Sequence, residues 1–457
     1  MTIPFPFEAC LVFGSLSIML LVGIVLRAKI TFFQDFLIPS CLIGGVLGLI
    51  LISTGLIDLS ASRLEAFAYH FFNISFISVG LSRTENEGKE SAPGKDYVRG
   101  ALWMALTQSA SFALQAVLGG LLVILFGIFG IKLFSTFGFL VPLGFEEGPG
   151  QALSFGKVWE GFGFEHAATI GMTFAAIGFL LAFFVGVPLT NWGIRKGHTA
   201  LGPMALPRDF LRGIMSKGEK TESAGELTMH TGNVDTLAFH AALIGLVYVL
   251  TYGFTLLLGK MIALFAPDVA KMLWGFFFFF GMVIAFSVRW LMGKIGLEYL
   301  INPGVQRRIT GWAVDFLIVS TVMAIQMVIV WRYILPIAVM AVFSGLFTTL
   351  MVIYLGRRLW SLNIERTVAI FGAVTGTVSS GLLLLRIADP EFKTPVAIEI
   401  GLMSLFMVPV ILGCGILVNA PIWWNWSIGL SILVFTGVFA LALILMRVLK
   451  LWGAPKF

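Results

Sequence analysis

Long stretches of this chain contain no charged residue. Most approach or exceed the roughly 20 residues that span a bilayer. The stretches without Asp, Glu, Lys or Arg cover residues 9–26, 36–57, 100–131, 167–194, 236–259, 272–288, 333–356, 367–385 and 400–446. The mean hydropathy of +0.97, with 12% charged residues, is also far more apolar than a soluble domain. The sequence therefore predicts an all-α polytopic membrane protein.

Two shorter apolar stretches, 66–82 and 316–331, fit as tilted or protein-surrounded helices. The last long stretch is divided near Pro421 and Asn425 into two spans. We therefore expect about 11 spans, at residues 8–26, 33–57, 66–82, 99–130, 163–190, 236–260, 272–294, 312–331, 333–356, 395–420 and 426–448.

Two polar, glycine-rich segments, 144–154 and 372–381, interrupt this apolar sequence nearly half a chain apart. Glycine and proline interrupt a helix, and freed backbone at membrane depth is tolerated only inside protein or beside a cavity. Matching interruptions in two halves of a membrane chain indicate the central binding site of a transporter. We place each break in a re-entrant hairpin, near 138–158 and 366–388.

The order of spans predicts two five-helix repeats, each with a hairpin, and an odd number of crossings inverts the second repeat. With the N-terminus outside, 24 of the 30 lysines and arginines fall on cytoplasmic segments. The exceptions are Arg63, Lys132, Lys157, Lys260, Lys271 and Arg332. This positive-inside bias places the C-terminus in the cytoplasm and has the hairpins entering from opposite faces.

Four segments follow from this pattern. Residues 1–191 form the N-terminal membrane repeat, and the polar residues 192–235 form a cytoplasmic linker. Residues 236–421 form the inverted C-terminal repeat, and residues 422–457 form an extra transmembrane helix and a cytoplasmic tail.

The breaks carry groups suited to a small ligand, because carbonyls bind a hard cation and helix N-terminal amides receive a carboxylate. The predicted substrate-binding residues are Gly148, Pro149, Gly150, Gln151, Thr377, Ser379 and Ser380. The predicted Na⁺ site comprises Glu147, Thr375 and Gly376. Two alternatives stay open: Glu146 and Glu147 are hydrated at the external mouth of the hairpin, or the hydroxyls of the second break bridge helices.

Other polar side chains at depth are expected to make hydrogen bonds between helices. They are His70, Asn73, Gln108, Ser109, Ser111 and Gln326. Near the second hairpin, Glu399 is expected to pair with Arg386. The three cysteines, Cys10, Cys41 and Cys414, have no metal-ligand or redox spacing and are read as small apolar residues. No grouping of catalytic side chains and no nucleotide-binding loop is found, so an enzyme is not expected.

With the breaks in place, the chain resembles the bacterial sodium/glutamate symporter family as a divergent member. The resemblance rests on the order of segments over most of residues 36–421 and on short motifs. These are residues 36–40 with Gly44 and Gly45, residues 70–81, residues 148–150, residues 163–164, residues 175–179, residues 186–188 and the second hairpin. The resemblance implies Na⁺-coupled uptake of an anionic amino acid by two inverted five-span halves.

We therefore expect an inner-membrane secondary transporter that carries a small carboxylate, glutamate or a related amino acid, with Na⁺ by alternating access. Its expected partners are Na⁺, the anionic substrate and the lipid bilayer, without nucleic acid and with no cofactor besides Na⁺. A homodimer, coupling to H⁺, another organic anion as substrate, a channel and a membrane enzyme acting on lipid stay open as alternatives.

Overall fold

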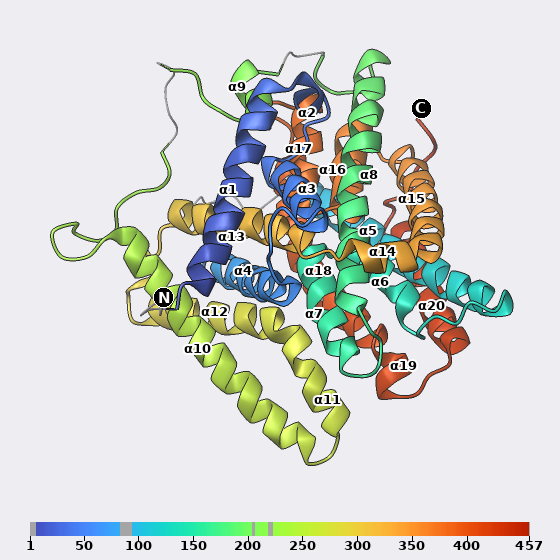
Figure 1. Cartoon of the computed structure of the whole chain (residues 1–457). Helices are drawn as coiled ribbons and strands as arrows, with labels where there is room; N and C mark the ends of the chain where they lie inside the picture. The colour runs from blue at the N-terminus through green and yellow to red at the C-terminus, as the bar shows by residue number, and fades with distance from the viewer. Residues whose placement is uncertain (1–5, 83–93, 203–205, 218–222, 457) are drawn as a thin grey trace.

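The chain folds into a bundle of helices of very different tilt (Figure 1). The computed structural model describes residues 6–82, 94–202, 206–217 and 223–456. In these ranges every regular element is a helix. Nine helices are long and apolar enough to cross a membrane within the described ranges, at Glu8–Lys29, Ala61–Leu81, Tyr97–Ile128, Ala167–Arg195, Thr236–Ala263, Pro267–Lys294, Ile334–Gly356, Val396–Leu417 and Ile428–Val448. The protein is therefore an all-α, multi-pass membrane protein.

The helices are labelled in chain order. Their bounds are α1 Glu8–Lys29, α2 Thr31–Asp35, α3 Ser40–Ser53, α4 Ala61–Leu81, α5 Lys95–Ile128, α6 Leu140–Phe145, α7 Pro149–Glu160, α8 Ala167–Arg195, α9 Arg208–Arg212, α10 Thr236–Ala263, α11 Pro267–Met272, α12 Phe277–Lys294, α13 Pro303–Met323, α14 Met327–Arg332, α15 Ile334–Gly356, α16 Asn363–Thr375, α17 Val378–Ala388, α18 Val396–Leu417, α19 Ala420–Trp423 and α20 Ile428–Val448. Short 3₁₀ helices cover Phe137–Phe139, Leu273–Phe276 and Glu298–Leu300.

Two predicted spans differ most from the helices observed. The span predicted at 33–57 is the shorter α3, which starts after Pro39 because the residue before a proline is disfavoured in helical conformation. The span predicted at 312–331 is wrong at both ends. Helix α13 begins at Pro303, where the Asn302 side chain accepts from the Val305 amide, and it ends at Met323. Asp315 therefore lies inside this helix rather than at its start.

One group of helices packs around α4 and α13, which contact each other directly. Helix α3 lies against α13, and α12 lies against α4. Small residues allow these close approaches: a Cβ at Gly45 would stand 2.9 Å from Val322 Cβ, and a Cβ at Gly80 would stand 2.7 Å from Ala285 Cβ. Glycine at such contacts lets helix backbones approach, as is usual inside membranes.

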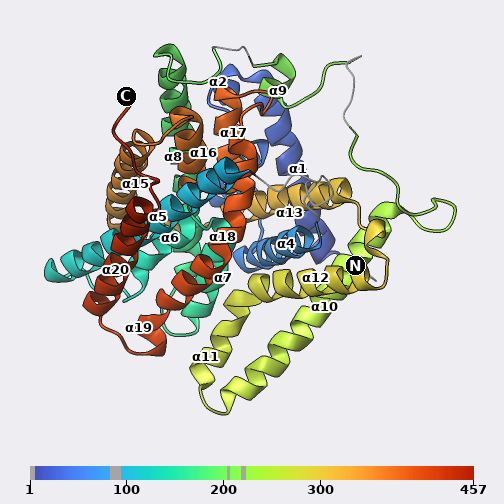
Figure 2. The ribbon, with the colours of Figure 1, turned by 180° about the vertical axis from the view of Figure 1, so that it is seen from behind.

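A second group surrounds the long helix α5, which packs against α15, α18 and α20. Seen from behind, α5 and α20 run side by side while α10 lies at the opposite edge of the bundle (Figure 2). The outward faces of α10 and α20 are apolar and exposed, with Val249, Leu257 and Leu433 each about two-thirds accessible or close to it. Such faces suit a lipid surround rather than water.

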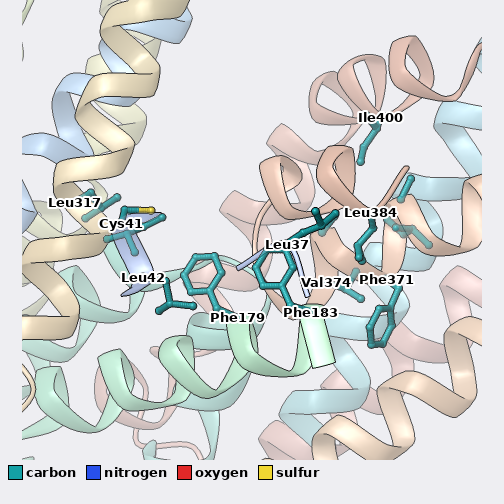
Figure 3. Close-up of a cluster of buried hydrophobic side chains, with 14 of the residues drawn as sticks. Leu37, Cys41, Leu42, Phe179, Phe183, Leu317, Phe371, Val374, Leu384 and Ile400 are labelled. Atoms are coloured by element: carbon teal, nitrogen blue, oxygen red, sulfur yellow. The ribbon is translucent and has the colours of Figure 1, made fainter. Parts of the chain in front are cut away.

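Helix α8 joins the two groups. Its Phe179 and Phe183 lie between Leu42 of α3 on one side and Phe371 and Leu384 of α16 and α17 on the other (Figure 3). The same helix packs against α6 and α7. Both interrupted helix pairs, α6–α7 and α16–α17, are therefore held by one continuous helix.

Helix α7 is also fixed at its far end. The indole N–H of Trp159 donates to Asn419 Oδ1 at 2.6 Å, and both side chains are fully buried. Replacing Trp159→Phe keeps an aromatic ring but leaves the amide oxygen of Asn419 without its donor. An unsatisfied buried polar group costs about 1–3 kcal/mol. We therefore expect Trp159→Phe to lower the thermal unfolding midpoint of the purified protein, whereas Trp290→Phe, at an exposed position, leaves it unchanged.

Candidate functional site

The first break is a sharp turn between α6 and α7. Helix α6 ends at Phe145, Glu146 and Glu147 follow, and α7 begins at Pro149. Between them Gly148 has φ 82° and ψ −178°. This backbone region is essentially open to glycine alone. The turn of the first predicted hairpin thus depends on the absence of a side chain at residue 148.

The second break is equally short. Helix α16 ends at Thr375, Gly376 is not helical, and α17 begins at Val378 with Thr377 as its N-cap residue. The Thr377 hydroxyl accepts from the Ser380 amide at 3.5 Å. A Cβ at Gly372 would stand 2.7 Å from the Gly381 Cα, so these two glycines bring the arms of the pair together. Their role is packing within the hairpin.

The two breaks meet inside the bundle. A Cβ at Gly148 would stand 3.3 Å from Thr377 Cγ2 and 3.7 Å from the Gly376 carbonyl oxygen. The N-cap residues of α7 and α17 are therefore close neighbours, and the two helix N-termini lie at one place. Because the first amides of a helix have no intrahelical partner and carry the positive end of its dipole, this arrangement favours an anion.

Helix α8 closes one side of the meeting point. A Cβ at Gly178 would stand 2.6 Å from the Thr375 carbonyl oxygen and 3.2 Å from the Phe145 Cα. Glycine at this position lets α8 touch the last residue of α6 and the last residue of α16 at once. Gly178 belongs to residues 175–179, one of the short motifs that carry the family resemblance. Its position against Phe145 and Thr375 was not predicted from the sequence.

Helix α4 closes another side through Phe72. A Cβ at Gly150 would stand 2.1 Å from Phe72 Cδ2, and both residues are buried. Gly150 therefore has no space for a side chain, and only its backbone is available to a ligand. The Pro149 ring at the first helical position is compatible with a helix start because proline lacks an amide N–H.

The neighbouring carboxylates of Glu146 and Glu147 differ in burial and in hydrogen bonding. Glu146 is 4% exposed, and neither of its carboxyl oxygens has a hydrogen-bond partner in the described chain. Glu147 is partly buried, and its Oε2 accepts from Gln151 Nε2 at 2.6 Å. The alternative in which both acids are hydrated at an external mouth is therefore wrong for Glu146.

The predicted site residues divide into two sets. The meeting point of the breaks contains Gly148, Pro149, Gly376 and Thr377, with Gln151 bound to Glu147 beside it. Ser380 is buried and its hydroxyl would stand 2.8 Å from a Cβ at Gly376. Ser379 is exposed and stands apart from this buried set. The Thr375 hydroxyl donates to the Phe371 carbonyl oxygen at 2.7 Å, so its own carbonyl is the freer oxygen.

Behind the first break, α5 contributes a polar face that sequence reasoning only partly identified. Gln115 was missed, although it follows Ser111 by one helical turn in an uncharged stretch, which is a usable signal. Its Nε2 donates to Ser111 Oγ at 3.1 Å, to Thr348 Oγ1 at 3.2 Å and to the Val374 carbonyl oxygen at 3.2 Å. Gln115 thus ties α5 to α15 and to the end of α16.

Two predicted interhelical contacts are confirmed: His70 Nδ1 lies 2.7 Å from Tyr248 Oη, and Gln326 Nε2 donates to Thr169 Oγ1 at 3.4 Å. Ser109 donates to the Ala105 carbonyl oxygen of its own helix at 2.8 Å and also lies 3.8 Å from Met407 Sδ of α18, which is a third interhelical contact. Asn73 and Gln108 are buried with side-chain atoms that lack partners among the described residues.

The predicted pair of Glu399 with Arg386 is wrong. Glu399 is fully buried and receives two bonds from Arg366, from Nη2 at 2.6 Å and from Nε at 2.8 Å. Arg386 lies instead over the Phe210 ring, 4.6 Å from its centroid. Arg366 is one helical turn into α16 and points at α18, whereas Arg386 is near the end of α17 and faces the linker helix α9.

No group of three or more His, Cys, Asp or Glu side chains suited to a metal ion occurs in the described ranges. A cavity of about 470 Å³ between α1 and α4 is lined mainly by apolar side chains and contains none of the predicted site residues. The arrangement at the breaks is instead one of backbone groups, hydroxyls, amides and carboxylates, which suit a small anion and a hard monovalent cation.

The comparisons with known proteins add no family. Neither the protein-family models nor the curated proteins contain a match to this chain.

Proposed function

We propose that this chain is a secondary active transporter that couples Na⁺ to the uptake of a small carboxylate, glutamate or a related amino acid. The observation that carries the proposal is the proximity of Gly148 and Thr377, the N-cap residues of α7 and α17, inside a membrane bundle. Two interrupted helices that meet this way form an anion site at membrane depth.

The substrate carboxylate takes the amides at the start of α7 and α17, near Gly150 and Gln151 on one side and Ser380 on the other. The cation takes oxygen ligands beside it, from Glu147 and from the carbonyls of Thr375 and Gly376. A cation there offsets the negative charge of the acid pair, which otherwise opposes an anionic substrate. Binding of each ligand therefore raises the affinity for the other by the same factor.

One packing pattern fits the proposal of two inverted halves. Helix α3 lies on α13 and α12 lies on α4, a crossed pattern expected when the second half repeats the first upside down. We propose an inner-membrane location with the N-terminus outside, from the lysine and arginine distribution. If more than one Na⁺ accompanies a monoanion, inward movement of net charge gains roughly 2.3 kcal/mol per charge per 100 mV.

The test is uptake into proteoliposomes that contain the purified full-length protein. Radiolabelled glutamate, aspartate, neutral amino acids, dicarboxylates and hydroxycarboxylates are each supplied with an inward gradient of NaCl or of choline chloride. We expect one carboxylate to accumulate about tenfold above equilibrium with the Na⁺ gradient and not with choline, which requires coupling rather than a pore.

Three other results would contradict parts of this proposal. Flux that never exceeds equilibrium indicates a channel. Accumulation that is driven by a pH gradient and does not depend on Na⁺ would show that the coupling ion is H⁺ and not Na⁺. Accumulation of a dicarboxylate in place of every amino acid keeps the mechanism and changes the substrate.

A further inference from the structure

Glu146 is a buried carboxylate without a hydrogen-bond partner among the described residues, which makes it a costly group. It is the C-cap residue of α6, it is 4% exposed, and both carboxyl oxygens lack a hydrogen-bond partner in the described part of the chain. The neighbouring charged group is the carboxylate of Glu147, so the two negative charges repel each other. A buried carboxylate beside a like charge requires a counter-ion or a proton.

Helix α5 packs against α6 and brings the Ser111 hydroxyl close to the Glu146 carboxyl. One turn further along the same face, Gln115 is fully buried, and all three of its recorded hydrogen bonds use its amide nitrogen. Its carbonyl oxygen Oε1 has no partner among the described residues. These bonds hold Gln115 firmly and leave a fixed acceptor without a donor.

This part of the bundle thus contributes the two carboxylate oxygens of Glu146 and the amide carbonyl of Gln115, which have no partner among the described residues, and the hydroxyl of Ser111, which accepts from Gln115 Nε2. Oxygen ligands without nitrogen or sulfur suit a hard cation. Gln151 is uncharged and leaves the charge of Glu147 in place, but Glu147 is a ligand of the cation proposed at the hairpin tips. The charge of Glu146 then remains to be neutralised, and one further positive charge does this.

We propose that Glu146, Ser111 and Gln115 form a second monovalent-cation site, between α5 and the end of α6 and separate from the site at the hairpin tips. This proposal rests on the proposed transport function for its role, because the cation neutralises Glu146 before an anion approaches the tips. Gln115 also donates to the Val374 carbonyl oxygen near the end of α16. A cation bound to Gln115 is therefore linked to the second break through this hydrogen bond.

The site can be tested without transport. The purified full-length protein is titrated with NaCl, with choline chloride keeping ionic strength constant, and the thermal unfolding midpoint is recorded in the absence of substrate. Binding to the folded state raises this midpoint with ligand concentration. We expect Na⁺ to raise it in the wild type, with half-saturation displaced about tenfold upward in Ser111→Ala and Gln115→Leu.

Glu146→Gln keeps the shape and removes the charge. We expect it to unfold at a higher temperature than the wild type without Na⁺ and to lose the Na⁺ response of this site. The control is Ser109→Ala on the same helix, whose hydroxyl donates to the Ala105 carbonyl of its own helix. Its Na⁺ titration should match that of the wild type.

The outcomes separate this site from the transport proposal. An unchanged Na⁺ titration in both Glu146→Gln and Ser111→Ala overturns the site, even where Na⁺-coupled uptake is observed. A wild-type midpoint that is independent of Na⁺ and rises on acidification, with this acid response lost in Glu146→Gln, would show that a proton neutralises Glu146. That result would also overturn the proposed cation site. A Na⁺ response that depends on Glu146 without any solute uptake retains the site and contradicts the transport function.

Discussion

Replacing Arg366→Met is expected to destabilise the protein by about 3–5 kcal/mol, because it leaves Glu399 as a buried carboxylate without its partner. The pair is almost completely buried and joined by two bonds, of 2.6 and 2.8 Å. Arg366 also donates to Ser361 and stacks on Trp360. The measurement is the thermal unfolding midpoint and the yield of monodisperse protein in detergent.

Two further variants give this prediction a control and a rescue. Arg63→Met removes an exposed ion pair with Glu8, whose side chains are 50% and 70% accessible, and should change the free energy of unfolding by less than about 1 kcal/mol. The double variant Arg366→Met with Glu399→Leu removes both charges and should recover most of the lost stability. A double variant as unstable as Arg366→Met alone would show that the loss comes from packing and not from the unpaired charge.

Replacing Gly148→Ala is expected to reduce substrate uptake roughly five- to 150-fold. The φ of 82° and ψ of −178° at this residue fall in a region that costs a residue with a side chain about 1–3 kcal/mol, and each 1.4 kcal/mol is tenfold. The added Cβ also presses on Thr377 at the meeting point of the two hairpins. Initial rates of uptake in proteoliposomes, divided by the amount of reconstituted protein, measure the effect.

The matched control is Gly55→Ala. Gly55 also has a positive φ, of 74°, but a Cβ there would have no atom within 4 Å. An alanine at this positive-φ position away from the breaks should leave uptake within about twofold of the wild type. Equal uptake by Gly148→Ala and wild type would contradict a transport site at the hairpin tips.

Much of the fold follows from the sequence because an apolar stretch of about 20 residues has few alternatives in a membrane. The uncharged stretches 100–131 and 236–259 became α5 and α10, and the divided stretch 400–446 became α18 and α20. The ends of helix α13 were harder to predict. It carries Arg307 and Arg308 near its start, so hydropathy alone placed its beginning too late.

The candidate site was only half predictable. Glycine and proline mark a break by their backbone chemistry, so residues 146–149 and 376–377 could be identified locally. The partner of Glu399 could not be, since Arg366 and Arg386 are both near in sequence and only the direction of each side chain separates them. Gln115 and Phe72 lie on α5 and α4, far in sequence from at least one of the breaks that they approach. Local sequence cannot show which distant residues pack beside a break.

The sequence by itself therefore determined which segments are helices and where two of them are interrupted, because both depend on local hydropathy and backbone freedom. Only the tertiary structure decided that Gly148 lies beside Thr377, that the carboxyl oxygens of Glu146 are buried without a hydrogen-bond partner among the described residues, and that Ser379 is exposed. These facts depend on how α4, α5 and α8 pack around the breaks, and packing joins residues that are far apart in the chain.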